Sequence, residues 1–280
     1  MKNILKCLLL FIFFSNQLIA QTPEHLYKIY HSASGLTLDW NSFVNHFKNT
    51  DIIIWGEEHN DSIGHLLERD LLESLNKLST KPLALSMEMF ETDVQGIMDE
   101  YLNNWISEKN FKKEARAWGN YKDYEPLVNF AKNNRLNVIC ANAPARYVNM
   151  VTRNNYKILN ELPKKTAKGY LPPLPLDTLN GKYYKNFLKI MGGHIMPNMN
   201  IYQAQNLWDA SMANNILKAS KKSRVFHING RFHSDEYLGT AERVIRKTNK
   251  SIQTISCFPA KDYNETKYKT LADFVILTDK

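Results

Sequence analysis

The sequence predicts an α/β protein with a mostly parallel sheet and helices on both faces. Short apolar runs typical of buried strands alternate along the chain with longer segments of helical periodicity. Successive strands are far enough apart for parallel crossovers, which need a dozen or more residues. A chain of 280 residues can also bury one sizeable core.

The run DIIIW at 51–55 predicts the first buried strand, and Gly56 predicts the turn that ends it. An amphipathic helix follows over 62–78. Glu57 and His59 therefore lie on a loop between a strand and a helix. In open α/β sheets this edge is where ligands bind.

The same alternation continues to the C-terminus. Further strands are expected at 83–89, 136–142, 223–230 and 251–258, with helices at 92–105, 144–153 and 234–247 after the first three of them. The run DFVILT at 273–278 adds a last strand, which we expect at an edge of the sheet.

A long segment, 154–219, interrupts the pattern between the third and fourth strands. It holds the loop LPPLPL and two helical stretches, 178–191 and 198–220. A parallel connection needs far fewer residues, so we expect a helical insertion over the carboxyl edge of the sheet. The alternative is a helical pair without a role in the site.

Residues 1–20 resemble a secretory signal, with a positive start, a short apolar core and a small residue at the end. Cleavage after Ala20 would leave a single domain over 21–280. Cys7 stands at the front of the apolar core, whereas a lipid-anchoring cysteine would follow it. We expect a protein exported to the periplasm or cell envelope, soluble or peripheral rather than lipid-anchored.

The net charge of +8 comes from scattered lysines without interleaved aromatic residues. A nucleic-acid partner is therefore disfavoured, and the basic surface favours anionic ligands or membrane surfaces. Cys140 and Cys257 each end a strand-like run. We expect them to be separate core residues rather than a disulfide.

Polar residues gather at one position in this pattern, the carboxyl ends of the predicted strands. Glu57 and His59 follow the first strand, Glu88 lies near the end of the second, Asn142 follows the third and His233 the fourth. In a parallel sheet these ends face the same way. The residues should therefore converge on one crevice.

Glu88 is flanked by Met87, Met89 and Phe90. A carboxylate in such surroundings must be paired, protonated or hydrogen-bonded. Burial should raise its pKa, which would suit a general acid or base. The alternative is a surface residue at a strand end.

Five segments, in order, resemble the motifs of the ChaN-like haem-binding proteins of the Tiki and erythromycin-esterase superfamily. They are GEEHND, SMEMFETDVQ, WGNYKDYEPLVNFAKNNRLNVICANAP, AQNLWDASMA and NGRFH. The resemblance implies a sheet-centred α/β fold and a haem-binding role in the envelope, linked to iron uptake. It also implies a tyrosine ligand to the haem iron and pairing of two subunits around the haems.

Erythromycin-esterase relatives are thought to activate water with a glutamate and histidine site. By the resemblance, Glu57 and His59 match the GE-x-H motif, Glu88 the glutamate of the second segment, and His233 the histidine of the last. The family's haem-ligating tyrosine lies outside the matched segments, so no residue here inherits that role.

Haem binding is the first functional hypothesis. Ferric haem needs an axial ligand, a flat apolar slot and cations near its propionates. The inserted segment offers Tyr202 and His194 as the first candidate ligands, with Tyr183 and Tyr184 as further ones. Expected partners are haem, a second copy of the chain and envelope components of iron uptake.

A hydrolase is the alternative hypothesis. His59 or His233 would take a proton from water while Glu57 and Glu88 orient it. No G-x-S-x-G motif appears, so a covalent serine nucleophile is not indicated. A divalent metal is a further option for two carboxylates and two histidines. A partner-binding module would explain the aromatic insertion but not Glu88.

Overall fold

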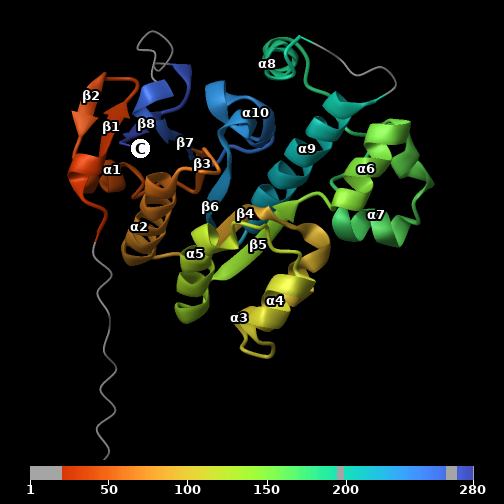
Figure 1. Ribbon diagram of the computed structural model, residues 1–280, viewed down its shortest axis with the longest axis horizontal. Helices are drawn as coiled ribbons and strands as arrows, with labels where there is room; N and C mark the ends of the chain where they lie inside the picture. The colour runs from red at the N-terminus through yellow and green to blue at the C-terminus, as the bar shows by residue number, and fades with distance from the viewer. Residues whose placement is uncertain (1–20, 194–198, 263–269, 280) are drawn as a thin grey trace, which may run out of the picture.

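The computed structural model describes residues 21–193, 199–262 and 270–279 (Figure 1). Eight strands of this part of the chain form one sheet in the order β2-β1-β8-β7-β3-β6-β4-β5. The strands are β1 (Tyr27–His31), β2 (Leu36–Leu38), β3 (Ile52–Glu57), β4 (Leu83–Glu91), β5 (Asn137–Asn142), β6 (Arg224–Gly230), β7 (Ile252–Pro259) and β8 (Phe274–Thr278). All pairings among β3 to β8 are parallel, whereas β1 pairs antiparallel with β2 and β8. The predicted fold class is confirmed.

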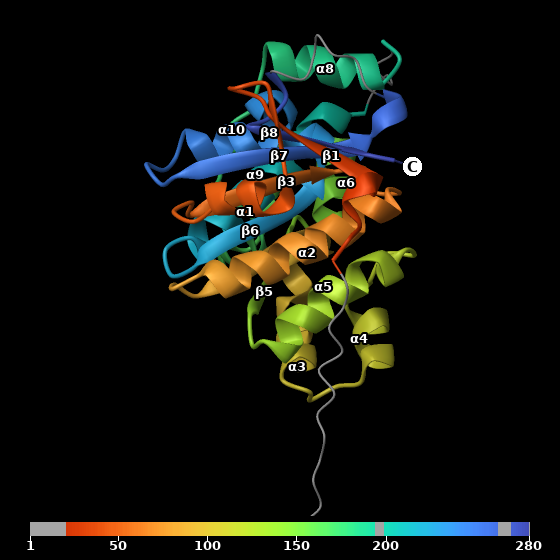
Figure 2. The same cartoon turned by 90° about the vertical axis from the view of Figure 1, so that its left-hand side faces the viewer.

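The helices lie on both faces of the sheet (Figures 1 and 2). They are α1 (Trp40–His46), α2 (Ser62–Leu78), α3 (Gln95–Leu102), α4 (Glu108–Glu114), α5 (Tyr121–Asn133), α6 (Ala145–Asn154), α7 (Lys164–Tyr170), α8 (Lys182–Ile190), α9 (Ile201–Ala219) and α10 (Gly239–Ile245). Short 3₁₀ segments add η3 (Tyr156–Glu161), η4 (Arg231–His233) and η5 (Asp235–Tyr237).

Residues 52–55 of strand β3 are all apolar because both faces of the strand are buried. Ile53 and Trp55 pack into the larger core, together with residues of α2 and α5. Ile52 and Ile54 point to the opposite face and pack with residues of α9 and α10. Because side chains alternate along a strand, a sheet covered on both faces needs apolar residues at every position.

Two predicted helices are shorter in the structure. The segment predicted as a helix over 92–105 forms a 3₁₀ turn and then α3, which ends before Asn104, a residue with a positive φ of 62°. The segment 234–247 begins with the 3₁₀ turn η5 and forms an α-helix only from Gly239, because Glu236 and Tyr237 both have positive φ. Helical backbone cannot pass through the left-handed region.

The prediction that 273–278 forms an edge strand was wrong. Strand β8 pairs with β7 on one side and with β1 on the other. The hairpin of β1 and β2, at 27–38, extends the sheet and was not predicted. These strands are short and partly exposed, which leaves little apolar signal to detect.

The inserted segment 154–219 contains η3, α7, α8 and α9. Helix α9 also serves as a covering helix, because it packs against α10 and against strands β4, β5 and β6. Helix α9 therefore approaches the site from one face of the sheet.

Cys140 and Cys257 are free and buried, as predicted for separate core residues. No helix within the described ranges has the length and apolar character needed to cross a membrane. The segment proposed as a secretory signal, 1–20, lies outside the described residues.

Candidate functional site

Three neighbouring strands carry the polar residues predicted for the site. Strand β3 ends at Glu57, β4 contains Glu88, and β6 leads directly into η4, which carries His233. The three strands are adjacent and parallel in the order β3-β6-β4. Their carboxyl ends therefore meet, and the structure brings together residues that lie up to 176 positions apart, from Glu57 to His233 (233 − 57).

His59 is held by a buried carboxylate. Its Nδ1 lies 2.7 Å from Glu57 Oε1, and the Tyr124 hydroxyl donates to the same oxygen at 2.8 Å. Burial alone would raise the pKa of Glu57, but hydrogen bonds from His59 and His65 lower it to about 2. The His59 side chain is 45% exposed, so this imidazole is accessible to a ligand.

His233 is held in the same way from the other face of the sheet. Its Nδ1 lies 2.7 Å from Asp209 Oδ1 of α9, and its Nε2 lies 3.5 Å from Glu88 Oε1. Burial opposes a charge on His233, but Glu88 and Asp209 raise its pKa to about 10. His233 is therefore an imidazolium at neutral pH.

Glu88 lies between the two histidines and is almost fully buried. The backbone N–H of Gly230 donates to Glu88 Oε2 at 2.7 Å. Burial raises the pKa of Glu88, as the sequence suggested. The charge and hydrogen bond of His233, the charge of His59 and the Gly230 N–H outweigh it, so the pKa falls below its ordinary value. The expected rise was wrong because these partners were not visible in the sequence.

Gly230 supplies the space between His59 and Glu88. A Cβ at this position would lie 2.7 Å from His59 Nε2 and 3.7 Å from Glu88 Oε2. Its φ of −56° is open to any residue, so this glycine is required for space and not for its conformation. His59 Nε2 and Glu88 Oε2 thus both border the space that a side chain at position 230 would fill.

Helix α9 contributes two residues to the site, Gln205 and Asp209. Helical spacing in the sequence predicts that they share a face with Tyr202, a candidate haem ligand. They contact His233, and Asp209 Oδ2 accepts a 2.6 Å hydrogen bond from Tyr183. Their helical spacing showed that they share a face, but only the tertiary fold shows what that face meets.

Tyr124 was missed altogether as a site residue. It lies on α5 within a segment quoted for the family resemblance, but tyrosines are common in this chain, 14 in all. No local signal distinguishes it from a packing residue.

Tyr202, one of the two candidate haem ligands, has its hydrogen-bond partner outside this cluster. The Tyr202 hydroxyl donates a hydrogen bond to the Leu179 carbonyl, and its ring packs against Tyr183 and Tyr184. Burial raises the pKa of Tyr202, so its phenol is neutral. His194 lies outside the described residues.

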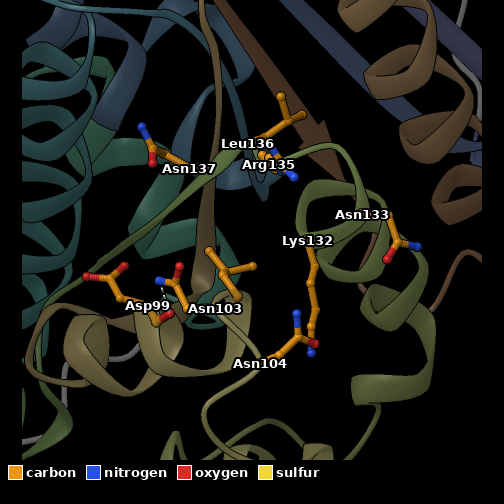
Figure 3. A pocket seen from close by; sticks show the side chains of 9 residues that line it. Asp99, Asn103, Asn104, Lys132, Asn133, Arg135, Leu136 and Asn137 are labelled. Atoms are coloured by element: carbon orange, nitrogen blue, oxygen red, sulfur yellow. Dashed lines mark hydrogen bonds between the residues drawn. The ribbon is translucent and has the colours of Figure 1, made fainter.

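A polar cavity of about 690 Å³ lies elsewhere, where β5 begins rather than where the strands end (Figure 3). Its lining is rich in asparagine and includes Asp99, Lys132 and Arg135. It contains none of the predicted site residues.

The parallel sheet, with two histidines held by carboxylates at its carboxyl edge, places the chain among the α/β proteins. Residues 43–244 match the family described as haem-binding uptake, Tiki superfamily, ChaN. The chain belongs to this family.

The chain is also similar to several solved structures. ChaN of Campylobacter jejuni, whose structure is described as showing cofacial haem binding, is 16% identical with a TM-score of 0.68, over 92% of this chain and 98% of that one. A mutant of erythromycin esterase EreC is 10% identical with a TM-score of 0.47, over 83% and 76%. A Bacillus cereus protein is 11% identical with a TM-score of 0.46, over 77% and 69%. A search of curated proteins found no match.

Proposed function

We propose that this chain is an exported haem-binding protein of the bacterial envelope that takes part in haem or iron uptake. The family match over 43–244 carries the proposal. The composition of the N-terminal segment supports export, because a positive start precedes a short apolar core. Haem, a second copy of the chain and envelope components of iron uptake are the proposed partners.

The inserted helices offer surroundings that suit haem. Helix α8 and the start of α9 form an aromatic group in which Tyr183, Tyr184 and Phe187 all lie near Tyr202. Ile190 and Met199, on either side of 194–198, are exposed apolar residues. Exposed Lys185 and Lys189 on α8 can meet propionates. A flat apolar ligand with two carboxylates fits this combination.

Tyr202 and His194 are the proposed axial ligands. Ligation by each of them would require different changes in the protein. Ligation by Tyr202 requires its hydroxyl to leave the Leu179 carbonyl and lose its proton, against a raised pKa. A neutral histidine needs neither change. The ligand therefore decides the absorption spectrum of the ferric complex.

We expect the haem-free protein to bind ferric haem with a defined absorption spectrum during titration. Tyr202→Phe keeps the ring and its packing, so it should change that spectrum without changing the Tm if Tyr202 is the ligand. His194→Ala tests the second candidate in the same way. Tyr156→Phe, on η3, is the matched control and should leave the spectrum unchanged.

Size-exclusion chromatography of the titrated protein tests the proposed pairing, which predicts a dimer when haem is bound. Wild-type protein that binds haem no better than bovine serum albumin would contradict the haem proposal.

Hydrolysis is a second candidate function, favoured by the two histidines with carboxylate partners on either side of Glu88. His59 is the accessible one, and its Nδ1 is fixed by Glu57. Burial opposes a charge on His59, but Glu57 and Glu88 raise its pKa, so the base is the neutral fraction of the ring, in which Nε2 can take a proton from water. Charged His233 and the Gly230 N–H would keep Glu88 ionised beside that water. The arrangement suits water activation without a covalent intermediate.

Gly230→Ala is expected to lower any such esterase activity about 100-fold or more, the usual contribution of a general base. The added methyl would displace the His59 ring, while the φ of −56° is acceptable to alanine. Initial rates on p-nitrophenyl acetate measure the effect. Gly96→Ala is the control, because a Cβ there meets nothing within 4 Å. A Gly230→Ala rate equal to that of the wild type would exclude His59 and Glu88 as the hydrolytic site.

A further inference from the structure

A second polar group lies behind Glu57, away from His59. It consists of Glu57 at the end of β3 and His65 and Glu68 on α2, all three buried. His65 Nδ1 lies 3.1 Å from Glu57 Oε2 and 3.4 Å from Glu68 Oε2. One donor atom from each residue lies within 4.8 Å of the other two.

Hydrogen bonds leave this group incompletely satisfied. His65 Nδ1 is within reach of both carboxylates, but it carries at most one N–H and cannot fully satisfy both of them. Among the described residues, Glu57 Oε2 and Glu68 Oε1 have no hydrogen-bond partner. A buried polar atom left unpaired is unfavourable, and more so when it is charged. Both oxygens therefore favour a further partner, either a proton shared between the two carboxyl groups or a cation.

Burial opposes a charge on His65, but the hydrogen bonds and charges of Glu57 and Glu68 raise its pKa to about 11, so without a metal this imidazole supplies one positive charge. Two buried carboxylates close together repel each other, and burial together with the charge of Glu57 raises the pKa of Glu68 well above its ordinary value. A divalent cation would neutralise both carboxylates and would take the place of the proton on His65 Nδ1.

The geometry points to a buried site for one divalent first-row metal ion, such as Zn²⁺, held by Glu57, His65 and Glu68. Ligand atoms about 2.0–2.1 Å from a tetrahedral ion are about 3.3 Å apart, and the two His65 separations, 3.1 and 3.4 Å, match this spacing. One imidazole and two carboxylates are a donor set that such ions accept.

The surroundings of the donors fit the same assignment. His65 Nε2 lies 3.3 Å from the His59 carbonyl and can donate to it. That hydrogen bond would leave the Nδ1 lone pair for the ion, and metal-binding histidines usually have their second nitrogen fixed in this way. Glu57 Oε1 stays engaged with His59 and Tyr124. The ion would thus fix the Glu57 carboxylate on the side that faces away from His59.

Metal content and thermal stability test this site without reference to haem or to hydrolysis. Haem-free wild-type protein is stripped with dipicolinate, dialysed against Zn²⁺ and analysed by mass spectrometry of the elements. We expect one Zn²⁺ per chain and a rise in Tm of about 5–10 °C at a concentration 100-fold above the Kd. Stripped protein that takes up no Zn²⁺ would overturn the proposal.

Variants locate the ion. Glu68→Gln keeps the shape of the side chain and should abolish Zn²⁺ uptake and the rise in Tm. Glu73→Gln, on the same helix, should keep both. His233→Gln should also keep the ion. Loss of the ion in this variant would show that the metal binds in the cluster of Glu88 and His233 instead.

An anomalous difference map of Zn²⁺-loaded wild-type crystals gives the answer even if Glu68→Gln fails to fold. We expect the peak between Glu57, His65 and Glu68. A peak at any other position, or full Zn²⁺ uptake by a folded Glu68→Gln variant, would refute the assignment.

Discussion

Replacement of Asp209 with asparagine is expected to lower the free energy of unfolding by about 3–5 kcal/mol, the usual cost of removing one partner of a buried ion pair. Asp209 is fully buried and accepts hydrogen bonds from His233, Tyr183 and Thr240. Without its charge, the imidazolium of His233 keeps only Glu88 as an anionic partner. Urea denaturation at pH 7, followed by circular dichroism, measures the loss.

Glu114→Gln is the matched control for this experiment. Glu114 also pairs with a cation, Lys113 at 3.2 Å, but both side chains are exposed, by 56% and 81%. Exposed ion pairs contribute little, so we expect a loss of less than about 1 kcal/mol. Equal losses in the two variants would show that the pairing of Asp209 with His233 does not stabilise the fold.

The stabilising effect of His233 is expected to disappear in alkali. Its pKa is raised to about 10 in the folded protein, against about 6.5 for an unperturbed histidine. A group with a raised pKa stabilises the fold fully below its unfolded pKa and loses this contribution as the pH rises through the folded pKa. The contribution of His233 should therefore be complete below pH 6.5 and lost by about pH 10–11.

Comparison with His233→Gln isolates this effect, since lysines and tyrosines titrate alike in both proteins. The stability advantage of the wild type should shrink by roughly 3–4 kcal/mol between pH 7 and pH 10.5. Urea denaturation across this range measures it, and the titration of His233 can be followed by NMR. A constant difference between the two proteins would mean that His233 is not held as an imidazolium by Glu88 and Asp209.

The sequence predicted the parallel part of the sheet well, because its strands are buried on both faces and so are continuously apolar. Helix α2 was predicted with the bounds it has in the structure, since Asp61 caps its start and its periodicity is regular. The hairpin of β1 and β2 was missed for the opposite reason. Its strands are short and partly exposed, so their pattern resembles that of a loop.

The candidate site was predictable in part for a similar reason. Glu57, His59, Glu88 and His233 follow strand ends, and strand ends of a parallel sheet converge whatever the order of the strands. Asp209 and Tyr124 lie within helices, where the sequence gives only which residues share a face. Their roles depend on how α5 and α9 pack on the sheet, which is a tertiary property.

The order of the strands also determines when the site can form during folding. Strand β6 lies between β3 and β4, yet it comes more than 130 residues after β4 along the chain. Until 224–230 have been synthesised and inserted, β3 and β4 have no common neighbour and each presents an unpaired edge. Contacts so distant in sequence form slowly, because a large loop must close first. Assembly of the Glu57, Glu88 and His233 cluster is therefore a late step in folding, and a chain that ends before β6 contains two of these residues without the strand that brings them together.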